Sequence, residues 1–150
     1  MKLKTLALTA LLSFAAAPVM AADCTIEIEG NDAMQFNVKE IEVSKSCDEV
    51  TINFKHVGNL PKAAMGHNVV VSKVADAQAI STEAAAAGPA NDYLNTDDER
   101  IVAHTAMVGG GEETSTTFKP ADLEDGEDYT FFCTFPGHFA IMKGDIKLVD

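Results

Sequence analysis

The sequence contains no tryptophan, two tyrosines and three cysteines, and it has few positive charges. Lys and Arg number 11 against 23 Asp and Glu, so the 150-residue chain has a formal net charge of −12. This charge argues against nucleic acids and anionic membranes as partners, because both attract cationic surfaces. Three cysteines are too few for a small disulfide-rich scaffold. A hydrophobic share of 47%, with 10 glycines and 5 prolines, excludes a disordered or collagen-like chain and suits one domain.

The N-terminal residues have the order that is typical of a secretory signal peptide. Lys2 and Lys4 precede an apolar stretch over 6–17, and small residues follow it. The alternative, a membrane anchor, would need about 20 apolar residues. We therefore predict a signal peptide over 1–21 and one domain over 22–150, exported to the periplasm without membrane insertion.

Cleavage would remove two lysines and change the net charge from −12 to −14. This acidity permits two interpretations, because it keeps a protein soluble and also complements a basic patch on a partner. The carboxylates form no paired motif, and no Ser, His and Asp residues have the spacing of a hydrolytic triad. The sequence therefore gives no sign of an enzyme.

Short alternating segments indicate an all-β fold. Residues 24–29 and 50–54 alternate between hydrophobic and polar side chains, as half-buried strands do. Further strands are expected over 41–43, 67–71, 101–104, 114–118, 129–134 and 145–149. The alanine-rich segment 74–87 favours a helix, which Gly88 and Pro89 end. About eight short strands with closely spaced turns predict a β-sandwich with one inserted helix.

In an oxidising compartment, three cysteines suggest one disulfide and one remaining thiol. We predict a Cys24–Cys47 disulfide, which would stabilise the fold by about 3 kcal/mol in the chain-entropy model. Both alternative pairings would use Cys133. A lone Cys133 fits either a small buried apolar residue or a metal ligand, since coordination would shield its thiolate.

Cys133 also begins the pattern C-x₄-H-x₃-M, which continues through His138 to Met142. A further histidine, His67, opens an apolar segment far upstream. Two histidines, one cysteine and a distant methionine are the donor set of blue-copper electron-transfer sites. Zinc could bind the same side chains, although structural zinc sites usually contain closely spaced cysteine pairs, which this sequence lacks.

Taken together, these motifs resemble the azurins, the bacterial type 1 copper proteins of the cupredoxin family. The resemblance extends over 22–150 and rests on short segments: the early cysteine pair, Gly-Asn-Asp (30–32), Gly-Asn-Leu-Pro (58–61), Met-Gly-His-Asn (65–68), Tyr-Leu (93–94), Ala-His-Thr (103–105), Phe-Phe-Cys-Thr-Phe-Pro-Gly-His (131–138) and Met-Lys-Gly (142–144). It implies a cupredoxin-like Greek-key β-sandwich and one copper ion. The sequence departs from the pattern at Val69, where azurins often have a buried tryptophan.

The resemblance also implies roles for individual residues. His67, Cys133 and His138 would be the strong equatorial ligands, Met142 the distant axial sulfur, and the carbonyl of Gly66 the opposite axial group.

Two further residues would support these ligands. Asn68 would join the two ligand loops by hydrogen bonds, and Phe135 would keep the metal dry. Partners would dock on a hydrophobic patch around His138, which contains Met34, Leu60, Met65, Pro136, Phe139 and Ala140. His56 and His104 lack ligand spacing. We expect His56 to be partly buried and His104 to lie at the surface.

The function implied is that of a monomeric one-electron carrier, not an enzyme, that cycles its copper between Cu(I) and Cu(II). The implied partners are c-type cytochromes and reductases of respiration or denitrification such as nitrite reductase. Three alternatives stay open at this point: a copper storage or delivery protein, a copper enzyme with an open coordination position, and a zinc-binding or purely structural sandwich.

Overall fold

The computed structural model describes residues 23–150, so the predicted signal peptide over 1–21 lies outside the described residues. The strands are β1 (Thr25–Gly30), β2 (Glu40–Ser44), β3 (Val50–His56), β4 (Val70–Lys73), β5 (Ile101–His104), β6 (Glu113–Phe118), β7 (Tyr129–Phe132) and β8 (Lys143–Val149). The helices are α1 (Lys62–Met65) and α2 (Val74–Ala87), with 3₁₀ turns at Pro89–Asn91, Pro120–Asp122 and His138–Ala140.

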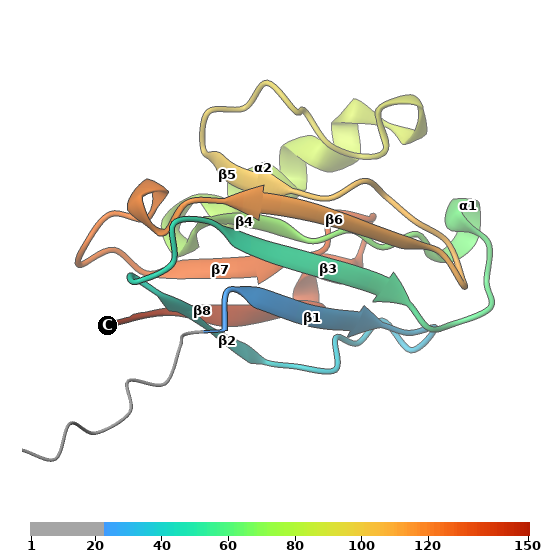
Figure 1. The fold of residues 1–150 in the computed structure, drawn as a ribbon. Helices are drawn as coiled ribbons and strands as arrows, with labels where there is room; N and C mark the ends of the chain where they lie inside the picture. The colour runs from blue at the N-terminus through green and yellow to red at the C-terminus, as the bar shows by residue number, and fades with distance from the viewer. Residues whose placement is uncertain (1–22) are drawn as a thin grey trace, which may run out of the picture.

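The strands form two sheets that face each other (Figure 1). One sheet has the order β1-β3-β6, and the other has the order β2-β8-β7-β4-β5. β1 pairs with β3 and β2 with β8 in parallel, whereas the other pairs are antiparallel. The predicted all-β sandwich with one main helix is confirmed.

The core between the sheets consists of the inward side chains of alternating strands. On β3, Val50, Ile52 and Phe54 are buried, while the residues between them are partly exposed. The ring of Phe36 contacts those of Phe54 and Phe131, with centroids 6.0 and 5.4 Å apart. Such close packing makes the strand ends fixed points from which loops can present side chains.

Helix α2 covers the outer face of the five-stranded sheet over β4 and β7 (Figure 1). Its Ala77, Ile80 and Ala84 are buried, and the first two join a second small core with Leu94 and Phe132. The helix has the predicted bounds, and it ends at Gly88, whose positive φ of 74° suits glycine. No helix within 23–150 is both long and apolar enough to cross a membrane.

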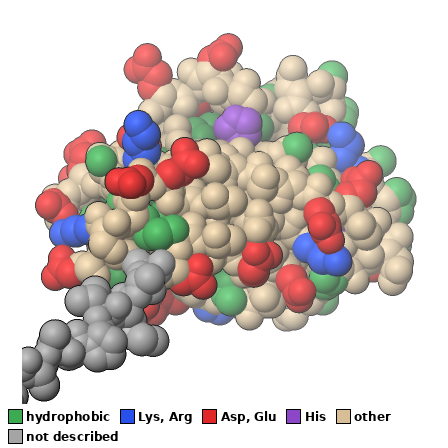
Figure 2. Space-filling model, in the orientation of Figure 1, with side chains coloured by type: hydrophobic (Ala, Val, Ile, Leu, Met, Phe, Trp, Pro, Cys, Tyr) green, Lys and Arg blue, Asp and Glu red, His purple; other side chains and the backbone are tan. Residues whose placement is uncertain are grey.

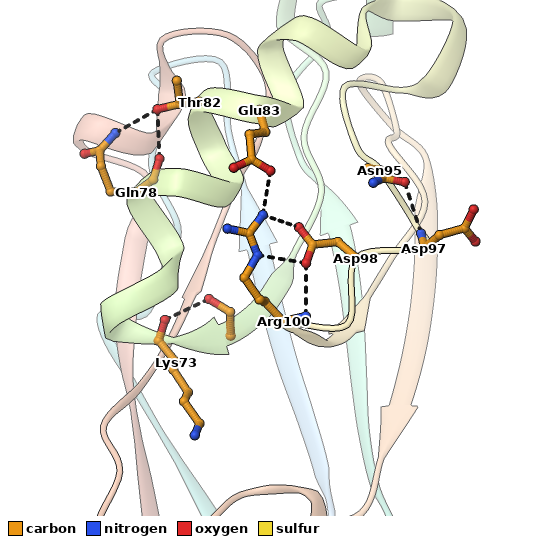
Figure 3. A network of polar contacts seen from close by, with 9 residues as sticks. Lys73, Gln78, Thr82, Glu83, Asn95, Asp97, Asp98 and Arg100 are labelled. Atoms are coloured by element: carbon orange, nitrogen blue, oxygen red, sulfur yellow. Dashed lines mark hydrogen bonds and ion pairs between the residues drawn. The ribbon is translucent and has the colours of Figure 1, made fainter.

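Arg100 connects the segment after α2 to the helix itself (Figure 3). Its Nη2 lies 2.6 Å from Oε2 of Glu83 and 2.6 Å from Oδ2 of Asp98, and its Nε donates to Oδ1 of Asp98 at 2.9 Å. The guanidinium lowers the pKa of the Asp98 carboxyl, whose side chain is only 11% exposed. The segment after α2 is therefore anchored to the helix by a charged network.

Most predicted strand boundaries differ from the structure by one to three residues, and two of the differences lie next to the candidate ligands. The strand expected over 67–71 begins only at Val70, because His67 forms an isolated bridge with Val108. The strand expected over 129–134 ends at Phe132, where the chain enters the loop that closes with the N–H of Cys133 donating to the carbonyl of Met142.

Candidate metal centre

Three buried donors meet at the end of the sandwich where β7 terminates. They are His67, Cys133 and His138, and their donor atoms all lie within 4.8 Å of one another. Sγ of Cys133 is 3.9 Å from Nδ1 of His67 and 3.7 Å from Nδ1 of His138. Metal bonds of about 2.0 Å to nitrogen and about 2.3 Å to sulfur would separate these atoms by roughly 3.5–3.8 Å at tetrahedral to trigonal angles. One transition-metal ion therefore fits the three donors.

The loop after β7 places three of the candidate ligands together. The left-handed conformation of Gly137, with φ 84°, turns the chain into the 3₁₀ turn that begins at His138. The N–H of Met142 donates to the carbonyl of His138 at 2.8 Å, and the N–H of Cys133 donates to that of Met142 at 3.0 Å. The loop thus closes on itself and brings Met142 back beside Cys133.

Met142 is completely buried next to the histidine from the other loop. A Cβ added to Gly30 would lie 2.9 Å from Cε of Met142 and 3.1 Å from Cδ2 of His67. The methionine methyl and the imidazole therefore both pack against Gly30, and only glycine leaves them this space.

His67 is oriented by a hydrogen bond on the side away from Cys133. Its Nε2–H donates to the carbonyl of Asn31 at 2.8 Å, which leaves Nδ1 as the acceptor that faces the thiol. Metal-binding histidines usually have this arrangement. The preceding residue, Gly66, has its carbonyl oxygen 3.9 Å from Sγ of Cys133. A Cβ on Gly66 would lie 2.7 Å from the carbonyl oxygen of Lys62, so glycine is required at this close approach.

Asn68 joins the two loops that carry the donors. Its Nδ2 donates to Oγ1 of Thr134 at 2.8 Å, and its Oδ1 accepts from the backbone N–H of Thr134 at 2.9 Å. Both residues are 1% exposed. The His67 and Cys133 segments are therefore held together whether or not a metal ion is bound.

Burial sets the protonation of all three donors. It raises the pKa of the Cys133 thiol to about 12, an effect that the backbone N–H groups of Asn68 and Phe135 oppose. It lowers the pKa of His138 to about 4, with the charges of His67 and His56 adding to the effect. It also lowers the pKa of His67. At neutral pH both imidazoles are neutral and ready to bind a cation, and a metal would have to displace the thiol proton.

This donor set favours copper among the common metals. A thiolate and a thioether are soft ligands that suit Cu(I), and imidazoles suit both copper oxidation states. The residues present therefore fit a copper ion.

His138 is nearly but not completely buried, at 3% exposure. Its Nε2 has no hydrogen-bond partner among the described residues. Every fully buried side-chain nitrogen or oxygen in this part of the chain does have a partner. Nε2 must therefore touch the surface.

The six residues predicted as a docking patch are all at least partly exposed. Leu60 is 42% exposed, and Pro136 and Ala140 are also exposed, whereas Met34, Met65 and Phe139 are half-buried. The Phe139 ring meets Phe132 edge-on and lies under Nζ of Lys143, so part of it is already covered.

Sequence reasoning missed the position of His56. It is fully buried rather than partly buried, and its ring stacks on His67 with centroids 4.3 Å apart. The N–H of Gly58 donates to Nδ1 of His56 at 3.1 Å, which places the ring proton on Nε2. This Nε2–H donates to the carbonyl of Met65 at 2.8 Å. His56 is therefore a packing partner of His67 outside the donor group. No local sequence pattern predicts this stacking. His104, predicted at the surface, is half-buried.

Comparisons with known proteins agree with this geometry. Residues 22–149 match the copper-binding proteins of the plastocyanin/azurin family. The chain is 60% identical to an azurin of Alcaligenes faecalis over 125 residues, which cover 83% of this chain and 98% of that protein. It is 52% identical to an azurin of Pseudomonas aeruginosa, covering 97% and 99% of the two chains. A solved azurin of Methylomonas sp. strain J superposes with a TM-score of 0.82 at 43% identity, covering 86% of this chain and all of that one.

Proposed function

Because the chain belongs to the plastocyanin/azurin family of copper-binding proteins, we propose that it carries single electrons on one copper ion bound by His67, Cys133 and His138. Met142 and the carbonyl of Gly66 are the further groups that would help to hold the ion. The observation that carries this proposal is the spacing of the three buried donor atoms, 3.7 and 3.9 Å from sulfur to nitrogen. When bound, copper supplies a one-electron change between Cu(I) and Cu(II).

The surrounding residues suit a carrier rather than an enzyme that binds substrate. The Asn68–Thr134 hydrogen bonds and the closed loop from Cys133 to Met142 fix the donors, so little rearrangement is needed when the charge changes. Complete burial of Cys133 and Met142 excludes water from the centre. Only the Nε2 edge of His138 reaches the surface, and it is therefore the expected route for electrons.

Docking would take place on the patch around His138 defined by Met34, Leu60, Met65, Pro136, Phe139 and Ala140. Substitution of Met65 with Glu would place a charge in this surface and should slow electron self-exchange by about tenfold or more, because like charges would then meet across the contact. Val74→Glu is the matched control, since Val74 is 49% exposed at the first position of α2, directly after the end of β4 that lies away from His67. Equal self-exchange rates in both variants, measured by NMR line broadening, would contradict docking on this patch.

The partners that we propose are c-type cytochromes and reductases such as nitrite reductase, which would present a basic docking patch. Figure 2 shows more acidic than basic side chains on the face that it displays, and the net charge supports the same choice. The rate of electron transfer with a c-type cytochrome should therefore fall as ionic strength rises. A rate that rises with salt would refute a basic partner surface. We further propose that the carrier is a monomer, which sedimentation equilibrium would test.

We also propose export to the periplasm as a single domain over 22–150, after cleavage of residues 1–21. The Cys24–Cys47 disulfide supports this location, because disulfides persist in oxidising compartments. Mass spectrometry of the protein from a periplasmic extract should give the mass of a chain that begins at Ala22. Recovery of the uncleaved chain from the cytoplasm would contradict the proposal.

A further inference from the structure

The turn that follows α2 contains two consecutive residues in the left-handed conformation. Asp92 has φ 50° and ψ 34°, and Tyr93 has φ 51°. Side chains other than glycine rarely adopt this conformation, and it persists only where surrounding contacts stabilise it. Within the turn, the N–H groups of both residues donate to the carbonyls of Pro89 and Gly88.

Tyr93 is connected to the metal centre through the ring of Phe135. The Tyr93 ring meets the Phe135 ring nearly edge-on, with centroids 5.2 Å apart and an interplanar angle of 67°. The Phe135 ring in turn lies against His138, with centroids 4.6 Å apart and an angle of 35°. Tyr93 thus covers Phe135 from outside, and Phe135 separates it from the imidazole.

A second contact leads from the same turn to the other ligand loop. Oδ1 of Asp92 lies 2.8 Å from Nζ of Lys62, the first residue of α1. This short helix runs directly into Gly66, and the carbonyl of Lys62 packs against that glycine. The turn therefore touches the segments that carry both histidine donors.

The two histidines differ in how their rings are oriented. The Nε2–H of His67 donates to the carbonyl of Asn31, which fixes that ring. Nε2 of His138 has no such acceptor among the described residues, although metal-binding histidines usually have one. Apart from the contact of its Nδ1 with Sγ of Cys133, the His138 ring is therefore oriented by packing, and Phe135 is the aromatic side chain whose ring centroid lies closest to it.

We propose that Tyr93 is a positioning residue of the metal centre, which restrains Phe135 and through it the ring of His138. The Asp92–Lys62 ion pair fixes the turn that presents the tyrosine. This inference rests on the proposed function insofar as His138 is taken as a ligand. Nε2 of His138 has no hydrogen-bond acceptor among the described residues because this edge of the ring reaches the surface. Packing of Tyr93 on Phe135, and of Phe135 on His138, takes over the orienting role of that hydrogen bond.

The test replaces Tyr93 with Asn, which removes the ring but tolerates the left-handed backbone. In the metal-free protein, NMR relaxation of the Phe135 and His138 rings should show increased motion. In the copper-loaded protein, competition with a chelator should show that the affinity for copper falls by about tenfold or more relative to the original protein. Tyr93→Phe keeps the ring contact and should restore both measurements to the original values. Lys62→Gln should increase ring motion in the same direction but less strongly.

The control is Asp98→Asn, which weakens the network around Arg100 in the same segment without a contact to Phe135. It should lower the unfolding temperature but leave ring motion and copper affinity unchanged. Unchanged ring motion in Tyr93→Asn, or an equal change in Tyr93→Phe or Asp98→Asn, would overturn the proposal. Failure of the original protein to bind copper through Cys133 would instead refute the proposed function, while the metal-free NMR comparison would still decide the role of Tyr93.

Discussion

Replacement of Asn68 with Ala would remove both hydrogen bonds that join the two donor loops. The backbone N–H of Thr134 would lose its acceptor at 2.9 Å, and the hydroxyl of Thr134 would lose its donor at 2.8 Å, both in a position that is 1% exposed. A buried polar group without a partner costs about 1–3 kcal/mol. The N–H cannot rotate toward another acceptor whereas the hydroxyl can, so we expect the free energy of unfolding to fall by about 2–4 kcal/mol.

Urea unfolding of the metal-free protein measures this loss without a contribution from copper binding. Asn53→Ala is the matched control, because its Nδ2 donates to Oε1 of Glu27 at 2.7 Å in an exposed position. Its loss should stay within about 0.5 kcal/mol, as is usual for surface substitutions. Equal losses in the two variants would refute the view that the Asn68–Thr134 pair holds the loops together. Thr134→Val, alone and combined with Asn68→Ala, would isolate the coupling between the two side chains.

Three further predictions concern the charged network and the cysteines. Because Arg100 lowers the pKa of Asp98 in the folded protein, the stability from this pair is complete above the unfolded carboxyl pKa and is lost as pH falls through the lower folded pKa. Arg100→Met should thus weaken the acid dependence of unfolding, and an unchanged slope would contradict this. Serine at both Cys24 and Cys47 should lower the free energy of unfolding by about 3 kcal/mol and leave the copper spectrum unchanged; an altered spectrum would count against a purely structural bond. Thiol titration of the unfolded, metal-free protein should find one free thiol, that of Cys133. A result of zero or three free thiols would contradict the disulfide assignment.

Local patterns were sufficient to predict most of the framework. Alternation identified the strand around Ile52, and alanine-rich composition identified α2 with its bounds. Cysteine counting in an exported chain predicted the Cys24–Cys47 disulfide, which the structure contains. These features depend on residues close in sequence or on a small number of possible pairings. The C-x₄-H-x₃-M spacing likewise places Cys133 and Met142 in one tight loop.

Features that depend on distant contacts could not be predicted in this way. The helix α1 has no amphipathic repeat, since it spans a single turn between Pro61 and Gly66. The stacking of His56 on His67 and the position of Tyr93 over Phe135 arise only when separate loops meet. Val69, where a tryptophan is common in the resembling proteins, is fully buried in the core, so the smaller side chain is accommodated by packing that no motif specifies.

The most direct test adds Cu(II) to the metal-free protein and records the visible spectrum before and after a mild reductant. The account predicts an intense blue band from a thiolate–copper bond, which bleaches on reduction and returns on oxidation. Cys133→Ser should abolish the band, while the Cys24 and Cys47 serine variant should keep it. A colourless protein whose Cys133 thiol still titrates after copper is added would contradict the account and favour a zinc-binding or purely structural sandwich.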